Sequence, residues 1–231
     1  MLTVLCFKWN TAGYRSVFTA EHVNTLQSMV SRHLKLDHRF ICITDDPTGL
    51  KCESFPLWDF PFVKSPTWKT NAYRCLKLFS ADAVNWFETE HVLVLDLDTV
   101  IVNDITSLID LDLDFKIWTD RHKNTHYNSS IWLYRLGSRS QVWDTFNPVV
   151  SPRKLKERNI MGSDQAWISY SLGSGEQTWS AQDGILSFRY NLDSGKTALP
   201  ENARIVFFHG KHDPWDEDIQ ESVSWVSEHY R

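Results

Sequence analysis

The apolar residues of this chain recur with two spacings, which predict strands and helices in alternation. Short continuous apolar runs are typical of buried strands, and apolar residues three and four positions apart are typical of helices packed on a core. The predicted strands cover residues 1–7, 39–44, 91–102, 115–119, 130–134 and 204–209. The first predicted helix follows a Thr19 cap and carries the spaced apolar residues Val23, Leu26, Val30 and Leu34. Two further helices are predicted at about 71–86 and at 163–172. This order favours an α/β fold, with a mostly parallel central sheet flanked by helices.

The segments between these elements give no sign of a second domain. Residues 51–66 are rich in proline and aromatic side chains and are predicted to be irregular. No linker, low-complexity segment or internal repeat interrupts the 231 residues, so we expect one domain. The longest apolar runs are far shorter than the roughly 18 residues of a membrane helix, and the first residues lack the basic start of a signal peptide. We therefore expect no membrane insertion.

The composition of the chain indicates in which cellular compartment the protein is expected and which binding partners it is not suited to. The four cysteines, Cys6, Cys42, Cys52 and Cys75, show no paired CxxC spacing, which is typical of reduced thiols in a cytoplasmic protein. A net charge of -5 provides no basic surface for tight nonspecific binding of nucleic acid. Eleven tryptophans are expected mostly in the core, and sugar stacking is the alternative role for some of them.

Two acids at the end of an apolar run form the most informative motif. Asp96 and Asp98 follow residues 91–95, and alternation along a strand would place both carboxylates on one face. Apolar residues on both faces before the acids predict a central parallel strand, and such strands bind ligands at their carboxyl ends. Two carboxylates that lie close together raise each other's pKa unless a cation lies between them. The pair therefore predicts a divalent metal site suited to Mg²⁺ or Mn²⁺.

The same acids also fit a phosphatase. Residues 95–100 match the strand motif of haloacid-dehalogenase-type phosphatases, with Asp96 as the nucleophile and Asp98 as the acid/base. In those enzymes the motif usually opens the fold near the amino terminus. Here a strand-helix-strand unit and a further helix are predicted before it, and no clear downstream acidic pair is present for magnesium. The phosphatase is therefore the second interpretation.

A second motif, residues 209–215, follows the apolar run 205–208. The imidazole of His209 is suited to complete a metal site with two aspartates. Gly210 permits a close approach of the backbone to phosphate, and Lys211 supplies positive charge to a diphosphate. A separate metal pair of His209 and His212 is the lower-ranked alternative.

Two further polar motifs lie in the second half of the chain. Asn128 belongs to an N-S-S sequence before the predicted strand 130–134, and Asp164 and Gln165 belong to an S-D-Q sequence that opens a predicted helix. Their functional interpretation is recognition of sugar hydroxyls. The alternative is that Ser163 or Asp164 serves only as a helix cap.

The four motifs, DxD, N-S-S, S-D-Q and H-G-x-x-x-P-W, occur in one order along residues 4–216. This order resembles the nucleotide-sugar glycosyltransferases of family eight, the glycogenin and bacterial galactosyltransferase type with the GT-A fold. Residues 4–9 and 40–46 are similar to a poorly characterised bacterial and phage branch of these enzymes. The resemblance implies a single Rossmann-like GT-A domain, with a nucleotide-sugar-binding half at 1–120 and an acceptor-facing half at 121–231. It also implies transfer of a hexose from a UDP-sugar with retention of anomeric configuration, in a bacterial or phage-infected cytoplasm.

Residue by residue, the resemblance implies a metal site and a donor site. Asp96, Asp98 and His209 would bind Mn²⁺ or Mg²⁺, with Asp96 also touching the ribose, and Gly210 and Lys211 would approach the diphosphate.

The remaining donor contacts are implied in the same way. Lys8, Trp9 and Tyr14 would hold the base, and Lys77 would contact the donor. Asn128, Asp164 and Gln165 would surround the donor sugar, the last two being the catalytic candidates.

This chain departs from the family pattern at one position, and its sequence does not identify the acceptor. The family usually has lysine immediately before the final Pro-Trp, and this chain has Asp213, so either Lys211 or Arg189 would supply the phosphate-binding charge. A saccharide or small-molecule acceptor is expected, and modified nucleic acid remains open. A non-catalytic carbohydrate-binding protein is the alternative outside the enzymes.

Overall fold

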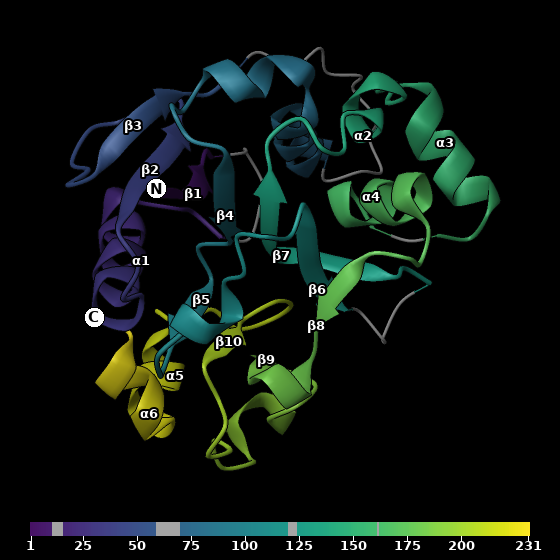
Figure 1. Ribbon diagram of the computed structural model, residues 1–231. Coiled ribbons are helices and arrows are strands. Elements are labelled where there is room, and N and C mark those ends of the chain that lie inside the picture. Colours follow the sequence, from purple (N-terminus) through teal and green to yellow (C-terminus); the bar gives the residue numbers. More distant parts are fainter. Residues whose placement is uncertain (11–15, 59–69, 120–123, 161) are drawn as a thin grey trace.

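The structure is a computed structural model that describes residues 1–10, 16–58, 70–119, 124–160 and 162–231. Its centre is a seven-stranded sheet with the order β3-β2-β1-β4-β7-β6-β8 (Figure 1). The strands are β1 Leu2–Lys8, β2 His38–Thr44, β3 Glu53–Pro56, β4 His91–Leu95, β6 Phe115–Thr119, β7 Tyr127–Arg135 and β8 Gln177–Trp179. Only β7 runs antiparallel to its neighbours, β4 and β6, among the strands described in this sheet. The expected α/β fold with a mostly parallel central sheet is confirmed.

A second, three-stranded sheet has the order β5-β10-β9. Its strands are β5 Thr99–Ile101, β10 Ile205–Phe207 and β9 Ile185–Ser187, and β10 is antiparallel to β5 and parallel to β9. The chain leaves the central sheet after β4 and enters the small sheet at β5. The segment that carries Asp96 and Asp98 is therefore the junction between the two sheets.

Helices cover both sheets. The α-helices are α1 Ala20–His33, α2 Gln141–Asp144, α3 Val150–Glu157, α4 Asp164–Leu172, α5 Glu217–Ser222 and α6 Ser224–His229. The 3₁₀ helices are η1 Thr70–Phe79, η2 Ala81–Asn85, η3 Thr106–Leu108, η4 Ala181–Asp183 and η5 Asp193–Gly195. Figure 1 shows α2, α3 and α4 grouped on one side of the sheet and α5 and α6 near α1. Within the described ranges, no helix has both the length and the apolar composition needed to cross a bilayer.

The two faces of the central sheet bury separate cores, which explains its continuous apolar runs. In β1, Val4 packs in the core formed with α1 and the small sheet, whereas Leu5 packs in the core formed with η1, α2 and α4. In β4, Leu93 belongs to the first core and Val92 to the second. Alternate side chains of a strand point to opposite faces, so a strand between two cores is apolar at every position.

Two secondary-structure predictions for the first half of the chain are wrong. The helix predicted at 71–86 consists of η1 and η2, separated at Ser80, whose backbone is extended. Of the region 51–66, predicted to be irregular, residues 59–66 lie outside the described residues, and residues 51–58 contain β3, which pairs in parallel with β2 at the sheet edge. Strand β3 is short, mostly exposed and ends in Pro56. Such edge strands lack the apolar pattern on which the prediction relied.

The strand predicted through 91–102 is also interrupted. Strand β4 ends at Leu95, and although the Asp96 N–H donates to the Ser130 carbonyl at 3.0 Å, the chain bends at Leu97 and Asp98. Leu97 is buried, and the next strand pairs in the other sheet. The two acids therefore lie on a bend rather than on one face of a single strand. A periodic pattern does not indicate which sheet a strand joins.

Strand β7 is longer than its predicted core of 130–134 and contains a bulge. Its pairing with β6 shifts between Ile117, opposite Trp132, and Trp118, opposite Asn128. Asn128 thus lies within the strand, and its Oδ1 accepts the N–H of Ser130 at 2.9 Å. Bulges redirect side chains at strand ends, and this one adjoins Asp96.

The alignment of β9 with β10 depends on Gly184. Its φ is +82°, a Cβ there would collide with the carbonyl oxygen of Asn202, and its own carbonyl accepts the N–H groups of Arg204 and Ile205. We expect Gly184→Ala to lower the free energy of unfolding by about 1–3 kcal/mol, because alanine is strained at this φ and meets backbone. Gly175→Ala is the control, since a Cβ at Gly175 meets no heavy atom within 4 Å. Denaturant titration that finds equal stability for the two variants would contradict this account.

Candidate functional site

The bend at residues 96–98 is held by backbone contacts from both sheets. The Ser130 carbonyl of β7 accepts the Asp96 N–H, and the Thr99 hydroxyl donates to the Asp96 carbonyl at 2.5 Å. The Asp98 carbonyl accepts the N–H of Phe208 at 2.8 Å. These bonds use main-chain atoms of the two aspartates, so their backbone holds the bend in contact with both sheets.

His209 lies beside this bend because of strand pairing. Thr99 in β5 is opposite Phe207 in β10, and His209 follows two residues later. The His209 Nε2 lies 2.9 Å from the hydroxyl of Ser187, and the ring is 5.9 Å from that of Trp118 and 5.7 Å from that of Tyr190. The structure therefore brings Asp96, Asp98 and His209 to one junction and fixes the orientation of the imidazole.

The Asp96 carboxyl lies in an unfavourable electrostatic environment. Asp96 is exposed to solvent. The surrounding protein nevertheless removes part of the hydration of its carboxyl group, which is the largest cause that raises its pKa well above the usual range. The negative charge of Asp164 is the second cause, and a hydrogen bond from the Ser130 hydroxyl acts in the opposite direction. Asp164, the first residue of α4, is buried with 8% exposure and accepts a hydrogen bond from the Ser163 hydroxyl at 2.7 Å. Asp164, at the start of α4, is thus close enough to Asp96 to disfavour ionisation of the Asp96 carboxyl.

These donors fit a hard divalent cation. Carboxylate oxygens and an imidazole nitrogen suit Mn²⁺ or Mg²⁺, and a nearby cation favours the ionised form of crowded carboxylates. Desolvation by the surrounding protein and the charge of Asp164 raise the pKa of Asp96, and a cation bound at this place would favour its ionised form. Asp96, Asp98 and His209 are the candidate metal ligands by chemistry and by strand pairing, but among the described residues their ligand atoms do not form a group within 4.8 Å of one another.

The candidate sugar contacts gather on the same side of the junction. Asn128 has 7% exposure and holds Ser130, the residue that hydrogen bonds to Asp96. Gln165 has 8% exposure and follows Asp164 at the start of α4, whose predicted position at 163–172 is confirmed with Ser163 as the N-cap. Asn128, Asp164 and Gln165 thus lie on elements that meet near Asp96.

The candidate base contacts are only partly placed. Lys8 is the last residue of β1 and is buried, and Trp9 follows it with its ring 6.0 Å from that of Phe7. Strand β1 is parallel to β4, so Lys8 is at the same end of the sheet as Asp96. Lys77 lies against Trp58, with its Nζ 6.0 Å from the ring centroid. Tyr14 lies outside the described residues.

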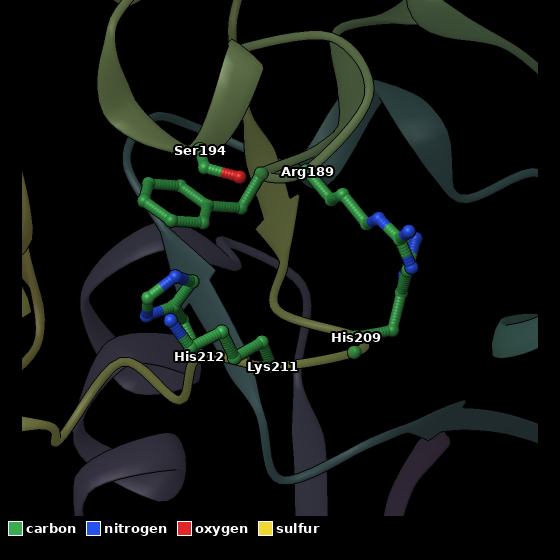
Figure 2. Close-up of a pocket in the computed structure, with 7 residues that line it drawn as sticks. Arg189, Ser194, His209, Lys211 and His212 are labelled. Carbon is green, nitrogen blue, oxygen red and sulfur yellow. The ribbon is translucent and has the colours of Figure 1, made fainter.

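A pocket of about 420 Å³ adjoins the junction. Its walls include Arg189, Ser194, His209, Gly210, Lys211 and His212. Figure 2 shows Arg189 entering from one wall and Lys211 and His212 from the opposite one. The backbone of Gly210 has a φ of +113°, and the Lys211 side chain is exposed. The predicted glycine and lysine of the second motif therefore both line a cavity next to His209.

Asp213 is buried and makes hydrogen bonds within the protein. It is buried with 4% exposure, its Oδ2 accepts the hydroxyl of Ser16 at 2.9 Å, and its N–H donates to Asp216 at 2.8 Å. His212, Asp216 and Asp218 form a further group whose ligand atoms lie within 4.8 Å of one another. Asp216 occupies the N-cap position of α5 without a side-chain cap bond, since its carboxylate accepts the Asp213 N–H, and Asp218 lies in the first turn of the helix.

Sequence reasoning missed the residues that support the site. Ser130 was part of a recognised motif, but its contact with Asp96 was not predicted. Ser187 and Ser16 had no sequence signal, because each contacts a residue that is distant along the chain. Such polar contacts become visible only when the sheets are assembled.

The fold matches solved glycosyltransferases. No protein-family model and no curated protein sequence matches the chain. The galactosyltransferase LgtC, in complex with donor and acceptor sugar analogs, is 16% identical with a TM-score of 0.58, over 99% of this chain and 96% of LgtC. A glycosyltransferase involved in the glycosylation of the major capsid of PBCV-1 is 14% identical with a TM-score of 0.56, over 98% of each chain. The apo form of the glycosyltransferase GlyE from Streptococcus pneumoniae TIGR4 is 12% identical with a TM-score of 0.61, over 98% of this chain and 60% of GlyE. The chain therefore has the GT-A fold of these glycosyltransferases.

Proposed function

We propose that this protein is a metal-dependent glycosyltransferase that moves a hexose from a UDP-sugar to an acceptor hydroxyl. The observation that carries the proposal is the junction of Asp96, Asp98 and His209 at the carboxyl end of β4, in a fold shared with glycosyltransferases. Ligands of open α/β sheets bind at the carboxyl ends of the strands. A saccharide or a small molecule is the proposed acceptor.

The reaction exchanges one bond to the anomeric carbon for another. The bond from this carbon to the β-phosphate oxygen breaks and its electron pair leaves with UDP, while the acceptor oxygen bonds to the carbon and releases its proton. Bound by Asp96, Asp98 and His209, Mn²⁺ or Mg²⁺ would supply positive charge to the leaving diphosphate. Asp96 also contacts the ribose, and Gly210 and Lys211 lie against the diphosphate.

The other residues bind and orient the donor. Asn128, Asp164 and Gln165 surround the hexose. Lys8, Trp9 and Tyr14 hold the base.

Lys77 is proposed as a further donor contact. The expected location of the reaction is the cytoplasm, as the reduced thiols of the sequence suggest.

UDP together with Mn²⁺ is expected to stabilise the folded protein. A ligand that binds only the folded state contributes roughly 2.7 kcal/mol at a hundredfold excess over its Kd. Thermal unfolding should therefore shift upward with UDP plus Mn²⁺, and EDTA should reverse the shift. A melting temperature that is unaffected by UDP with Mn²⁺ or Mg²⁺ would argue strongly against the proposal.

Asp98→Asn is expected to lower UDP release by more than roughly a hundredfold while the protein stays folded. Loss of a residue that only supports a metal ligand already costs 10–100-fold, and the backbone bond of Asp98 to Phe208 is kept. Asp112→Asn, which removes one exposed carboxylate outside the site, is the control.

Three other outcomes identify the alternatives. Normal UDP release by Asp98→Asn would exclude the metal assignment. Release of phosphate from small phosphoesters that depends on Asp96 would favour the phosphatase. Sugar binding without turnover would favour a carbohydrate-binding protein.

Transfer is expected to proceed with retention, so an α-linked donor should give an α-glycoside. An inverting enzyme needs a carboxylate base beside the acceptor, and Asp164 is the motif acid outside the proposed metal ligands. Loss of a general base costs roughly 10²–10⁴-fold, so Asp164→Asn should slow transfer by less than this if Asp164 only orients the donor. Proton NMR of the fresh product gives the configuration. A β-linked product together with an inactive Asp164→Asn variant would reverse the assignment.

A further inference from the structure

The pocket beside His209 concentrates positive charge in a protein whose net charge is -5. Arg189 and Lys211, both exposed, line it from different segments of the chain, and His212 also lies on its wall. Two cations and an imidazole around a cavity of about 420 Å³ favour an anionic ligand.

Strand pairing places Arg189 beside His209. In the small sheet Ser187 is opposite Phe207, and the N–H of Phe188 donates to the Phe207 carbonyl at 3.0 Å. The rings of Phe188 and Phe208 then stack at 4.1 Å. Both phenylalanines are buried, so the backbone that carries Arg189 is fixed next to the backbone that carries His209.

The guanidinium of Arg189 lies across the loop that begins at Gly210. A Cβ built on Gly210 would lie 3.5 Å from Arg189 Nη1 and 3.6 Å from its Cδ, which is ordinary contact distance. The guanidinium carbon also lies 5.0 Å from the ring centroid of Tyr190, a cation–π contact. Tyr190 in turn lies 5.7 Å from the His209 ring. Arg189 is therefore held at the pocket next to the candidate metal ligand and to the backbone of Gly210.

Asp213, in contrast, is unsuited to bind phosphate. Its carboxylate is buried and accepts the Ser16 hydroxyl, which joins the 209–216 loop to the segment before α1. A negative charge at this position also repels a phosphate group. Positive charge for a diphosphate has to come from elsewhere in the pocket.

We propose that Arg189 binds the diphosphate of the donor together with Lys211, while Asp213 serves as the structural link of this loop. The inference rests on the proposed function, because it assigns a residue to the same donor site. A guanidinium offers planar paired donors that match two phosphate oxygens, which an ammonium group cannot reproduce.

Calorimetric titration with UDP, with uridine and with inorganic pyrophosphate, each with Mn²⁺, tests this assignment. Arg189→Ala should weaken binding of UDP and of pyrophosphate by about ten- to hundredfold, the loss typical of a charged hydrogen bond, and should leave uridine binding unchanged. Arg189→Lys should recover only part of the affinity. Arg153→Ala, which removes an exposed arginine of α3, should bind all three probes like the wild type.

The outcomes separate the inference from the proposed function. UDP binding to the wild type that Arg189→Ala leaves unchanged would overturn the role of Arg189 and leave the glycosyltransferase standing. Arg189-dependent binding of pyrophosphate without binding of UDP would support the diphosphate site and contradict the choice of nucleotide. If the wild type bound neither UDP nor pyrophosphate, both proposals would fail. Equal losses for uridine and UDP would show a structural effect and overturn the role of Arg189.

Discussion

The pairing of β5 with β10 is the constraint on which the candidate site depends. It is a three-residue antiparallel ladder, continued by the bond from the Phe208 N–H to the Asp98 carbonyl. Without it, the acids after β4 and the histidine after β10 would belong to unrelated parts of the chain. Because the ladder is made of backbone atoms, its geometry does not depend on the identity of the side chains at its end.

The surroundings of the junction disfavour the ionised form of Asp96. Asp96 is near Asp164, and the pKa of its carboxyl is raised by the surrounding protein and by that charge. Positive charge is supplied by Arg189 and Lys211, which line the pocket that includes His209. A ligand that combines a cation with a diphosphate matches both halves of this pattern, whereas a neutral sugar alone matches neither.

The sequence predicted the elements of this fold better than their connections. The apolar runs of β1, β2 and β4 were found because both faces of these strands are buried, and α4 was found with its cap because Ser163 and Asp164 mark a helix start. Strand β3 was not predicted, because an exposed edge strand has no apolar pattern. The bend at Asp96 and Asp98 escaped because apolar residues continue on both sides of it, although the strands before and after it belong to different sheets. Motif order predicted Asp96, Asp98 and His209 as metal ligands, which stays a prediction, whereas the supporting serines depend on contacts between distant segments and leave no local pattern.

The antiparallel position of β7 within the central sheet has a consequence for biosynthesis. Strands β1, β2 and β4 leave the ribosome first, and the free edge of β4 is covered only when β7 has been made. Strand β5 waits longer still, since its partner β10 lies close to the carboxyl end of the chain. A nascent chain therefore exposes the apolar edge of β4 until β7 is made and leaves β5 unpaired until β10 is made, and such edges are sites of mispairing between chains. Slow translation would prolong the time for which β5 lacks its partner, because β10 follows it by about a hundred residues.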